Sequence, residues 1–148
     1  SDARLAAERV LDELRSANPK RTLTLEARTG NTFGNWDVER IAQIISNLAS
    51  NALRYGDKES AVAVILEDGP ANSMVISVHN RGLPIAPDLL PHLFEPYKRG
   101  ADAPTAYAGG LGLGLYIVRE LARAHGGEVT VSSTALDGTT FRAKLPRT

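Results

Sequence analysis

The 148-residue chain contains no cysteine, which excludes disulfide bonds, thiolate metal sites and cysteine nucleophiles. It also lacks an excess of charge, since 17 basic residues balance 17 acidic ones. A dedicated nucleic-acid-binding domain usually carries a basic excess, so we expect no nucleic-acid partner. The sequence has no apolar run near the roughly 20 residues needed to span a bilayer, and no secretory signal pattern opens it.

The residues that are present suit one globular domain covering 1–148. Hydrophobic residues make up 43% of the chain, enough to form a core and too many for a disordered chain. No internal repeat or domain linker is visible. The opening Ser1-Asp2-Ala3-Arg4 is typical of a cut made inside a longer protein. We therefore expect a cytoplasmic fragment whose parent is either membrane-anchored or soluble.

Hydrophobic periodicity predicts an alternation of helices and strands. Helical spacing predicts helices at 4–17, 38–55 and 112–125. Strand-like runs occur at 21–27, 61–67, 73–80, 128–133 and 139–145. Two adjacent hairpins in this order favour a mixed, mainly antiparallel sheet with its helices on one face, which is a two-layer α/β sandwich. Gly126 and Gly127 are both expected to end the third helix in the left-handed conformation.

Closely spaced glycines lead into the third helix. At a helix start, free N–H groups and the positive dipole end favour anions, and glycines let a phosphate approach the backbone. The Walker pattern fails because Gly112-Leu113-Gly114 has no following Lys or hydroxyl. The Rossmann pattern fails because these glycines do not directly follow a strand. A flexible loop with a close helix–sheet contact is the alternative interpretation.

An amide stripe on the second helix provides a possible partner for the glycines. Asn47 and Asn51 are four residues apart, and Arg54 follows on the same side. Asparagine is unfavourable inside helices, so two in register suggest a purpose beyond stability. An amide oxygen suits Mg²⁺, and Arg54 could pair with phosphate. A solvated face or a local hydrogen-bonded pair is the alternative for each asparagine.

Five segments resemble, in order, the N, G1, F, G2 and G3 boxes of a known family. They read "NLASNALRY", "HNRGLPI", "LFEPYKRG", "GGLGLGLYIVRELARAHGG" and "DGTTF". The family is the catalytic ATP-binding domain of sensor histidine kinases, within the GHKL superfamily. The resemblance spans about 36–146 and implies the Bergerat-type α/β sandwich. It also implies that residues 1–20 form the connection from a dimerisation and histidine phosphotransfer domain that the chain lacks.

The resemblance implies a set of ATP and Mg²⁺ contacts. Asn51 corresponds to the Mg²⁺ ligand, and Asn80 to the residue that hydrogen-bonds the adenine amino group. Ile85 would pack on the base, and Thr139 would contact adenine, often through water. Arg99 is a cation placed to reach the γ-phosphate; with Asn47 and Arg54 it makes up the expected catalytic group. The remaining nucleotide contacts would be Tyr55, Gly82, Phe94, Tyr97, Lys98 and the hinge and phosphate cradle Gly110, Leu111, Gly112, Leu113, Gly114 and Leu115.

The chain departs from the family pattern at several positions. Asn80 replaces the usual aspartate, which weakens its hydrogen bond to adenine by about 1 kcal/mol. Pro84 stiffens the same turn, and Leu111 stands where a small polar residue is common. These departures leave open a second interpretation, a non-catalytic nucleotide-binding or regulatory module.

Position 47 bears on the chemistry. ATP-hydrolysing relatives carry a glutamate there as general base, and Asn47 cannot serve as one near neutral pH. We therefore favour phosphoryl transfer over a GHKL ATPase or an anti-sigma-type serine kinase. His79, His92 and His125 lack the "HExRTP" setting of the phosphorylated histidine and are expected to be structural or exposed. The expected partners are the histidine-bearing domain of the parent protein and a response regulator, with a monomeric fragment and a homodimeric parent.

Overall fold

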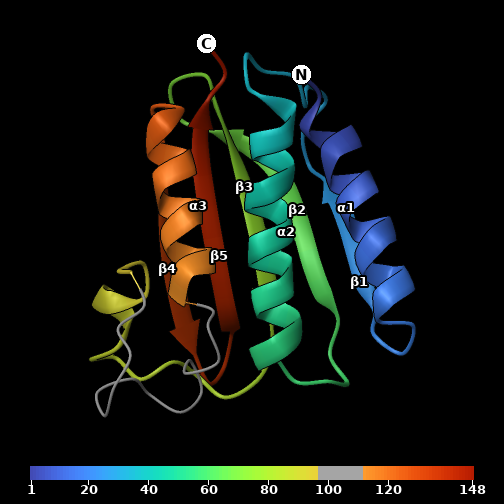
Figure 1. The fold of residues 1–148 in the computed structure, drawn as a ribbon, viewed down its shortest axis with the longest axis vertical. Coiled ribbons are helices and arrows are strands. Elements are labelled where there is room, and N and C mark those ends of the chain that lie inside the picture. Colours follow the sequence, from blue (N-terminus) through green and yellow to red (C-terminus); the bar gives the residue numbers. More distant parts are fainter. Residues whose placement is uncertain (97–111) are drawn as a thin grey trace.

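The computed structural model describes residues 1–96 and 112–148, which form a helical layer over a sheet (Figure 1). The elements, in chain order, are α1 (Ala3–Ala17), β1 (Leu23–Ala27), α2 (Val38–Tyr55), β2 (Val62–Gly69), β3 (Ser73–Asn80), the short 3-10 helix η1 (Leu90–His92), α3 (Gly112–Ala124), β4 (Glu128–Thr134) and β5 (Gly138–Pro146). Each predicted helix and strand is confirmed, with bounds that shift by no more than a few residues. None of the helices in the described part is long and apolar enough to cross a lipid bilayer.

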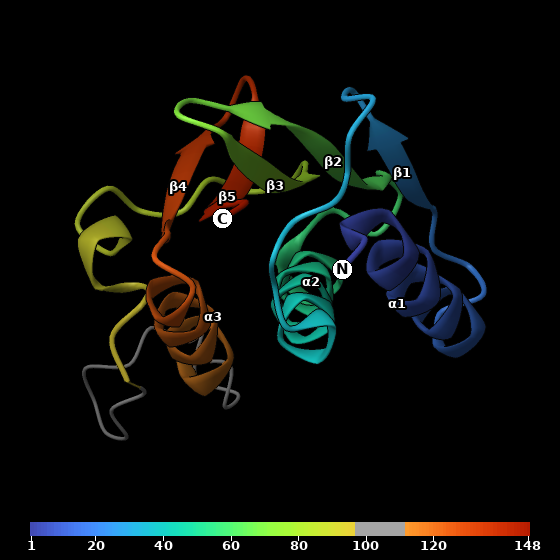
Figure 2. The ribbon, with the colours of Figure 1, turned by 90° about the horizontal axis from the view of Figure 1, so that it is seen from above.

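The sheet has the strand order β1-β2-β3-β5-β4. β1 pairs with β2 in parallel, whereas the other three pairings are antiparallel. All three α-helices lie on one face of this sheet (Figure 2). The predicted two-layer sandwich with a mixed, mainly antiparallel sheet is therefore confirmed.

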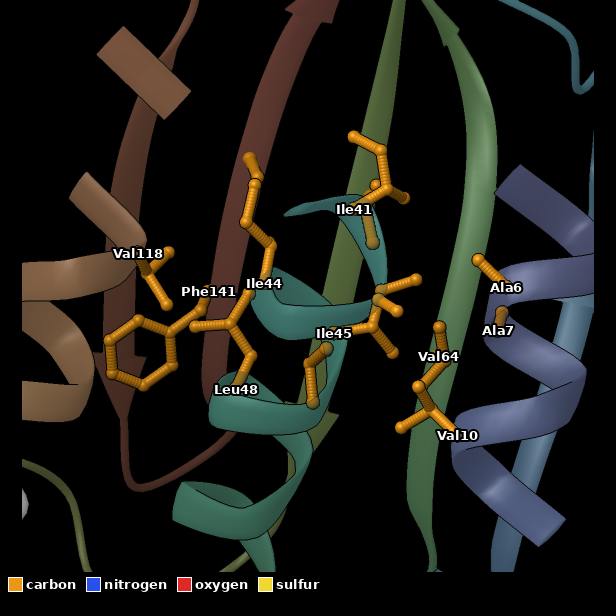
Figure 3. Packing of buried hydrophobic residues seen from close by; sticks show 14 of the residues in the cluster. Ala6, Ala7, Val10, Ile41, Ile44, Ile45, Leu48, Val64, Val118 and Phe141 are labelled. Carbon is orange, nitrogen blue, oxygen red and sulfur yellow. The ribbon is translucent and has the colours of Figure 1, made fainter. Parts of the chain in front are cut away.

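α2 occupies the centre of the helical layer because its apolar residues recur at helical spacing. The Asp37 side chain accepts a hydrogen bond from the Glu39 N–H at 3.0 Å, which caps the helix start as predicted. Ile44, Ile45 and Leu48 are fully buried. They lie between Val118 and Phe141 on one side and the α1 residues on the other (Figure 3). Each such side chain contributes about 1.5–3 kcal/mol through burial.

The end of α3 corrects one detail of the prediction. Gly126 has a φ of 78°, the left-handed conformation expected of a helix cap. Gly127 does not share it. A Cβ at Gly127 would lie 1.9 Å from the Lys144 carbonyl oxygen on β5. Gly127 is therefore required by close packing of two backbones rather than by its φ angle.

Candidate functional site

The helix-facing side of the sheet changes from apolar to polar at one end. On β3 and β5, apolar side chains at every second residue are buried on this face. At the end where α2 finishes, the same face carries Asn80 on β3 and Thr139 on β5. Asn80 is paired with Thr139, and Thr139 with Ser133 on β4. Residues paired across strands project from the same face of a sheet. Three polar side chains from three neighbouring strands therefore lie side by side at this end.

A hydrogen-bonded chain joins two of these residues to the loop that follows β3. The Ile85 N–H donates to Ser133 Oγ at 2.8 Å, and Ser133 Oγ lies 2.6 Å from Thr139 Oγ1. Ile85 and Thr139 are both buried. Sequence reasoning missed Ser133, because only the β4–β5 register brings it to Thr139.

Asn80 is 7% exposed and lies against the end of α2. Its Nδ2 donates to the Arg81 carbonyl oxygen at 3.3 Å. A Cβ at Gly56, the residue that ends α2, would lie 2.9 Å from the same nitrogen. The carbonyl partner identifies the nitrogen side of the amide, so the Asn80 oxygen is left to accept a hydrogen bond from a ligand.

The turn after Asn80 depends on Gly82. Its φ of 149° lies in a region that side chains rarely adopt, and a Cβ there would lie 3.0 Å from the Asp57 nitrogen. The Asp57 N–H donates to the Arg81 carbonyl oxygen at 2.6 Å, which ties this turn to the chain beyond α2. The strand end that carries Asn80 is thus held directly beside the end of α2.

The two asparagines of the predicted amide stripe differ in burial. Asn51 is 3% exposed, and its Oδ1 has no hydrogen-bond partner among the described residues. Asn47 is half-buried, and its Nδ2 donates to the Gly114 carbonyl oxygen at 3.3 Å, which links α2 to α3. A buried amide oxygen without a partner costs about 1–3 kcal/mol. Its hard, neutral oxygen matches the ligands that Mg²⁺ accepts.

A cation and an aromatic ring complete this end of α2. Arg54 is exposed, and its guanidinium carbon lies 5.8 Å from the centre of the Tyr55 ring. Burial raises the pKa of the Tyr55 hydroxyl above its ordinary value, and the Arg54 charge partly opposes this. The phenol therefore stays neutral at physiological pH, and Arg54 places an exposed positive charge beside it.

The remaining predicted residues fall into two groups, those that the structure describes and those outside the described residues. Phe94 packs edge-on against Phe141, with ring centres 5.9 Å apart, and at the start of α3 Leu115 is buried and Leu113 exposed. Gly112 begins α3. Outside the described residues lie Tyr97, Lys98, Arg99, Gly110 and Leu111.

Each histidine contacts a nearby protein group. His79 Nε2 lies 2.6 Å from the Asp137 carbonyl oxygen, and His92 Nδ1 lies 2.9 Å from Glu95 Oε1. His125 Nδ1 donates to the Leu121 carbonyl oxygen at 2.8 Å, within the last turn of α3. These contacts agree with the structural or exposed roles expected for all three histidines.

Comparison with known proteins identifies this arrangement. The family model described as "Histidine kinase-, DNA gyrase B-, and HSP90-like ATPase" matches residues 36–148. The chain belongs to this ATPase family. Curated proteins similar to the chain include the sensor histidine kinase YkoH of Bacillus subtilis, 34% identical over 134 residues, and the signal transduction histidine-protein kinase AfsQ2 of Streptomyces coelicolor, 38% identical over 124 residues. These alignments cover 90% and 83% of this chain but only 29% and 22% of the two relatives.

Solved structures of the family share the fold. The mycobacterial sensor histidine kinase MprB superposes with a TM-score of 0.82 at 22% identity, covering 99% of this chain and 96% of that one. Full-length ShkA in complex with AMPPNP superposes with a TM-score of 0.76 at 27% identity, covering 97% of this chain and 29% of ShkA. The predicted membership of the histidine kinase type of ATP-binding domain is therefore confirmed, and the chain is a module of the size found within longer sensor kinases.

Proposed function

We propose that the domain binds Mg·ATP between α2 and the start of α3 and presents the γ-phosphate to a histidine on another domain. The observation that carries this proposal is the buried Asn51 oxygen, which has no hydrogen-bond partner among the residues that the structure describes. Folding tolerates such a group at a cost of about 1–3 kcal/mol, and a ligand that occupies it would remove that cost. Asn51 stands at the family's Mg²⁺ position, as the resemblance implies.

The adenine would lie at the polar end of the sheet. Asn80 would accept a hydrogen bond from its amino group, because the amide nitrogen is already engaged with Arg81. Thr139 would add a hydroxyl contact, and Ile85 a buried apolar surface. The phosphates would extend toward the N–H groups at the α3 start, where the helix dipole favours negative charge.

Catalysis would rest on positioning and charge neutralisation, as in phosphoryl transfer generally. Asn51 would hold Mg²⁺, whose chemistry is to neutralise charge on the phosphate oxygens. Arg54, exposed beside the site, would supply a further positive charge, together with Arg99 from outside the described residues. The γ-phosphoryl bond to ADP breaks as a bond to an imidazole nitrogen of the acceptor histidine forms.

Asn47 supports transfer to a protein rather than hydrolysis. A hydrolase needs a base to activate water, and an amide is not a base near pH 7. The Asn47 nitrogen donates to the Gly114 carbonyl oxygen, so its role is to join α2 to the start of α3. A positioned imidazole on another domain needs no such base in order to attack.

The acceptor and the signalling partners belong to the whole protein. His79, His92 and His125 each contact local protein groups, so we place the phosphorylated histidine in a dimerisation domain of the parent. We further propose a homodimeric parent, a cytoplasmic location for this ATP-binding domain and a response regulator that receives the phosphoryl group. The rival function, a non-catalytic nucleotide-binding module, is favoured by the replacement of the usual aspartate with Asn80.

Asn51→Ala tests the proposal, with calorimetry of ADP binding in Mg²⁺ and in EDTA. The wild-type chain is expected to bind ADP more tightly with Mg²⁺. The variant should lose at least about tenfold of that difference, because the metal loses a direct ligand. Its free energy of unfolding without nucleotide should stay within about 1 kcal/mol of wild type, since removal of an unsatisfied acceptor offsets lost packing. In the parent protein, acid-labile phosphorylation should disappear.

Gln43→Ala is the matched control, an amide two turns earlier on the same helix, half-buried in the groove between α1 and α2. It should leave ADP binding and its Mg²⁺ dependence unchanged. An Asn51 variant that keeps full Mg²⁺ dependence contradicts the assignment. Wild-type binding of ADP without phosphorylation of the parent favours the non-catalytic module, and acid-stable phosphoserine favours a serine kinase.

A further inference from the structure

We propose that Ser133 is a positioning residue of the nucleotide site, which orients the Thr139 hydroxyl toward the adenine and anchors the Ile85 backbone beneath it. The inference rests on the proposed function and adds to it a residue on β4, outside the five family-like boxes. It is carried by hydrogen bonds, strand register and burial within the described residues.

Ser133 connects two parts of the site that are far apart in sequence. Its Oγ accepts a hydrogen bond from the Ile85 N–H at 2.8 Å, across 48 residues of sequence. The same atom lies 2.6 Å from Thr139 Oγ1 on the neighbouring strand. One hydroxyl therefore joins the loop under the base to the strand that carries the polar contact.

The first member of this chain fixes one of its donor and acceptor roles. A backbone amide can only donate, so Ser133 Oγ is an acceptor toward Ile85. A hydroxyl that accepts a hydrogen bond is polarised and becomes a better donor. Between Ser133 and Thr139 either hydroxyl can be the donor, and we assign this role to Ser133. The Thr139 proton is then left to point away from Ser133.

This orientation matters because of the position of Thr139. Thr139 is buried and lies opposite Asn80 in the β3–β5 register. With Asn80 accepting from the adenine amino group, the Thr139 proton can be donated to an adjacent ring nitrogen or to a bridging water. Ring nitrogens of adenine are acceptors, so a hydroxyl held as a donor complements the base. Without Ser133, the Thr139 hydroxyl would rotate freely and the Ile85 N–H would lose its partner.

The test is a double-mutant cycle of ADP binding with Ser133→Ala and Thr139→Val in the 148-residue chain. In the wild-type background, Ser133→Ala should weaken ADP binding roughly tenfold, about the effect of one or two lost hydrogen bonds. In the Thr139→Val background the same change should cost no more than about threefold, because the hydroxyl that it orients is absent. Equal losses in both backgrounds would show that Ser133 does not act through Thr139.

Two further variants separate positioning from general damage. Ser133→Thr keeps a hydroxyl at a half-buried edge-strand position and should bind ADP within about threefold of wild type. A loss as large as that of Ser133→Ala would contradict the role of the hydroxyl. Ser132→Ala is the matched control, since Ser132 is exposed on the same strand and its Oγ accepts from Arg142 Nη1 at 3.1 Å; its ADP binding should not change.

The two proposals fail in different ways. Absence of ADP binding by the wild-type chain overturns the proposed function and this inference with it. Normal ADP binding by the wild type together with unchanged binding by Ser133→Ala overturns the inference alone.

Discussion

At the scale of single residues, the close approach of a neighbouring backbone leaves some positions with room for glycine but not for a residue with a Cβ. Gly127 sits between α3 and β4, and a Cβ there would lie 1.9 Å from the Lys144 carbonyl oxygen. A backbone atom cannot turn away as a flexible side chain can. Gly30 lies in an exposed bend, and no described atom would lie within 4 Å of a Cβ there. Neither glycine has a positive φ, but the two differ in how much space surrounds them.

Gly127→Ala is expected to lower the free energy of unfolding by about 3 kcal/mol, because the new methyl group forces β4 away from β5. Gly30→Ala, the control, should change it by less than about 0.5 kcal/mol. Denaturant unfolding of the nucleotide-free chain measures both. Similar values for the two variants would mean that the sheet adjusts to the added methyl group without cost.

Residues were predictable from sequence where their signal is local. Asn47 and Asn51 stood out because two amides recur at helical spacing beside an apolar stripe. Ser133 did not, since its partners are 48 and 6 residues away and meet only through strand pairing. A Gly-Gly pair after a helix is a common ending and predicts a cap at Gly127, whereas the real constraint on Gly127 comes from β5.

At the scale of elements, α3 combines a structural and a proposed binding role at its first turn. Gly114 lies in this turn, and its carbonyl oxygen accepts from Asn47 Nδ2 at 3.3 Å. No described atom would lie within 4 Å of a Cβ at Gly114. Glycine costs a helix about 1 kcal/mol relative to alanine. Gly114 therefore lowers the stability of α3 at the place where the backbone would contact the phosphates.

Gly114→Ala should raise the free energy of unfolding by up to about 1 kcal/mol, because alanine favours the helix. It should also weaken ADP binding by roughly tenfold or more, because the methyl group stands where the phosphates would approach the backbone. Ala124→Gly, at the exposed other end of α3, should lower stability and leave ADP binding unchanged. Wild-type affinity in Gly114→Ala would contradict the proposed placement of the phosphates at α3.

The elements could be predicted from sequence because periodicity and turn residues act over short distances. The order of the strands could not. β5 lies between β3 and β4, and β1 runs parallel to β2. Both facts depend on crossings between segments that are distant in sequence. The side-by-side position of Asn80, Thr139 and Ser133 follows from the same pairings, which is why the sequence alone predicts only part of the site.

At the scale of the whole molecule, the two chain termini and the proposed binding site lie at opposite ends. Both termini lie at one end, whereas α2 ends and α3 begins at the other (Figure 1). At the terminal end, the Trp36 Nε1 donates to the Pro146 carbonyl oxygen at 2.7 Å. The Asn35 N–H donates to the Arg147 carbonyl oxygen, also at 2.7 Å. These two hydrogen bonds thus hold the C-terminal residues against the segment between β1 and α2, far from the proposed nucleotide site.

Asp68 adds a charged group to the contacts that hold the C-terminal residues in place. Its Oδ1 accepts hydrogen bonds from Arg147 Nη2 at 2.7 Å and from the Thr29 hydroxyl at 2.8 Å. Arg147 Nη2 also donates to the Asn31 carbonyl oxygen at 2.8 Å. The hydrogen bond from Arg147, and after it the one from Thr29, hold the pKa of the Asp68 carboxyl below its ordinary value. The ionised carboxylate therefore stabilises the folded chain at pH above the ordinary aspartate pKa of about 3.9, and this contribution is lost as the pH falls through the lowered value.

Asp68→Asn is expected to lower stability at pH 7, because a neutral amide oxygen accepts a weaker hydrogen bond from Arg147. The difference from wild type should shrink as the pH falls from about 5 toward 3, since protonation makes wild-type Asp68 neutral as well. Denaturant unfolding followed by the fluorescence of Trp36, the single tryptophan, measures this at each pH. The ADP affinity of the folded variant at pH 7 should equal that of wild type, because the substitution lies at the far end of the molecule. A stability difference that stays constant with pH would show that the carboxylate charge contributes nothing here, and a weaker ADP affinity would show that the two ends are coupled.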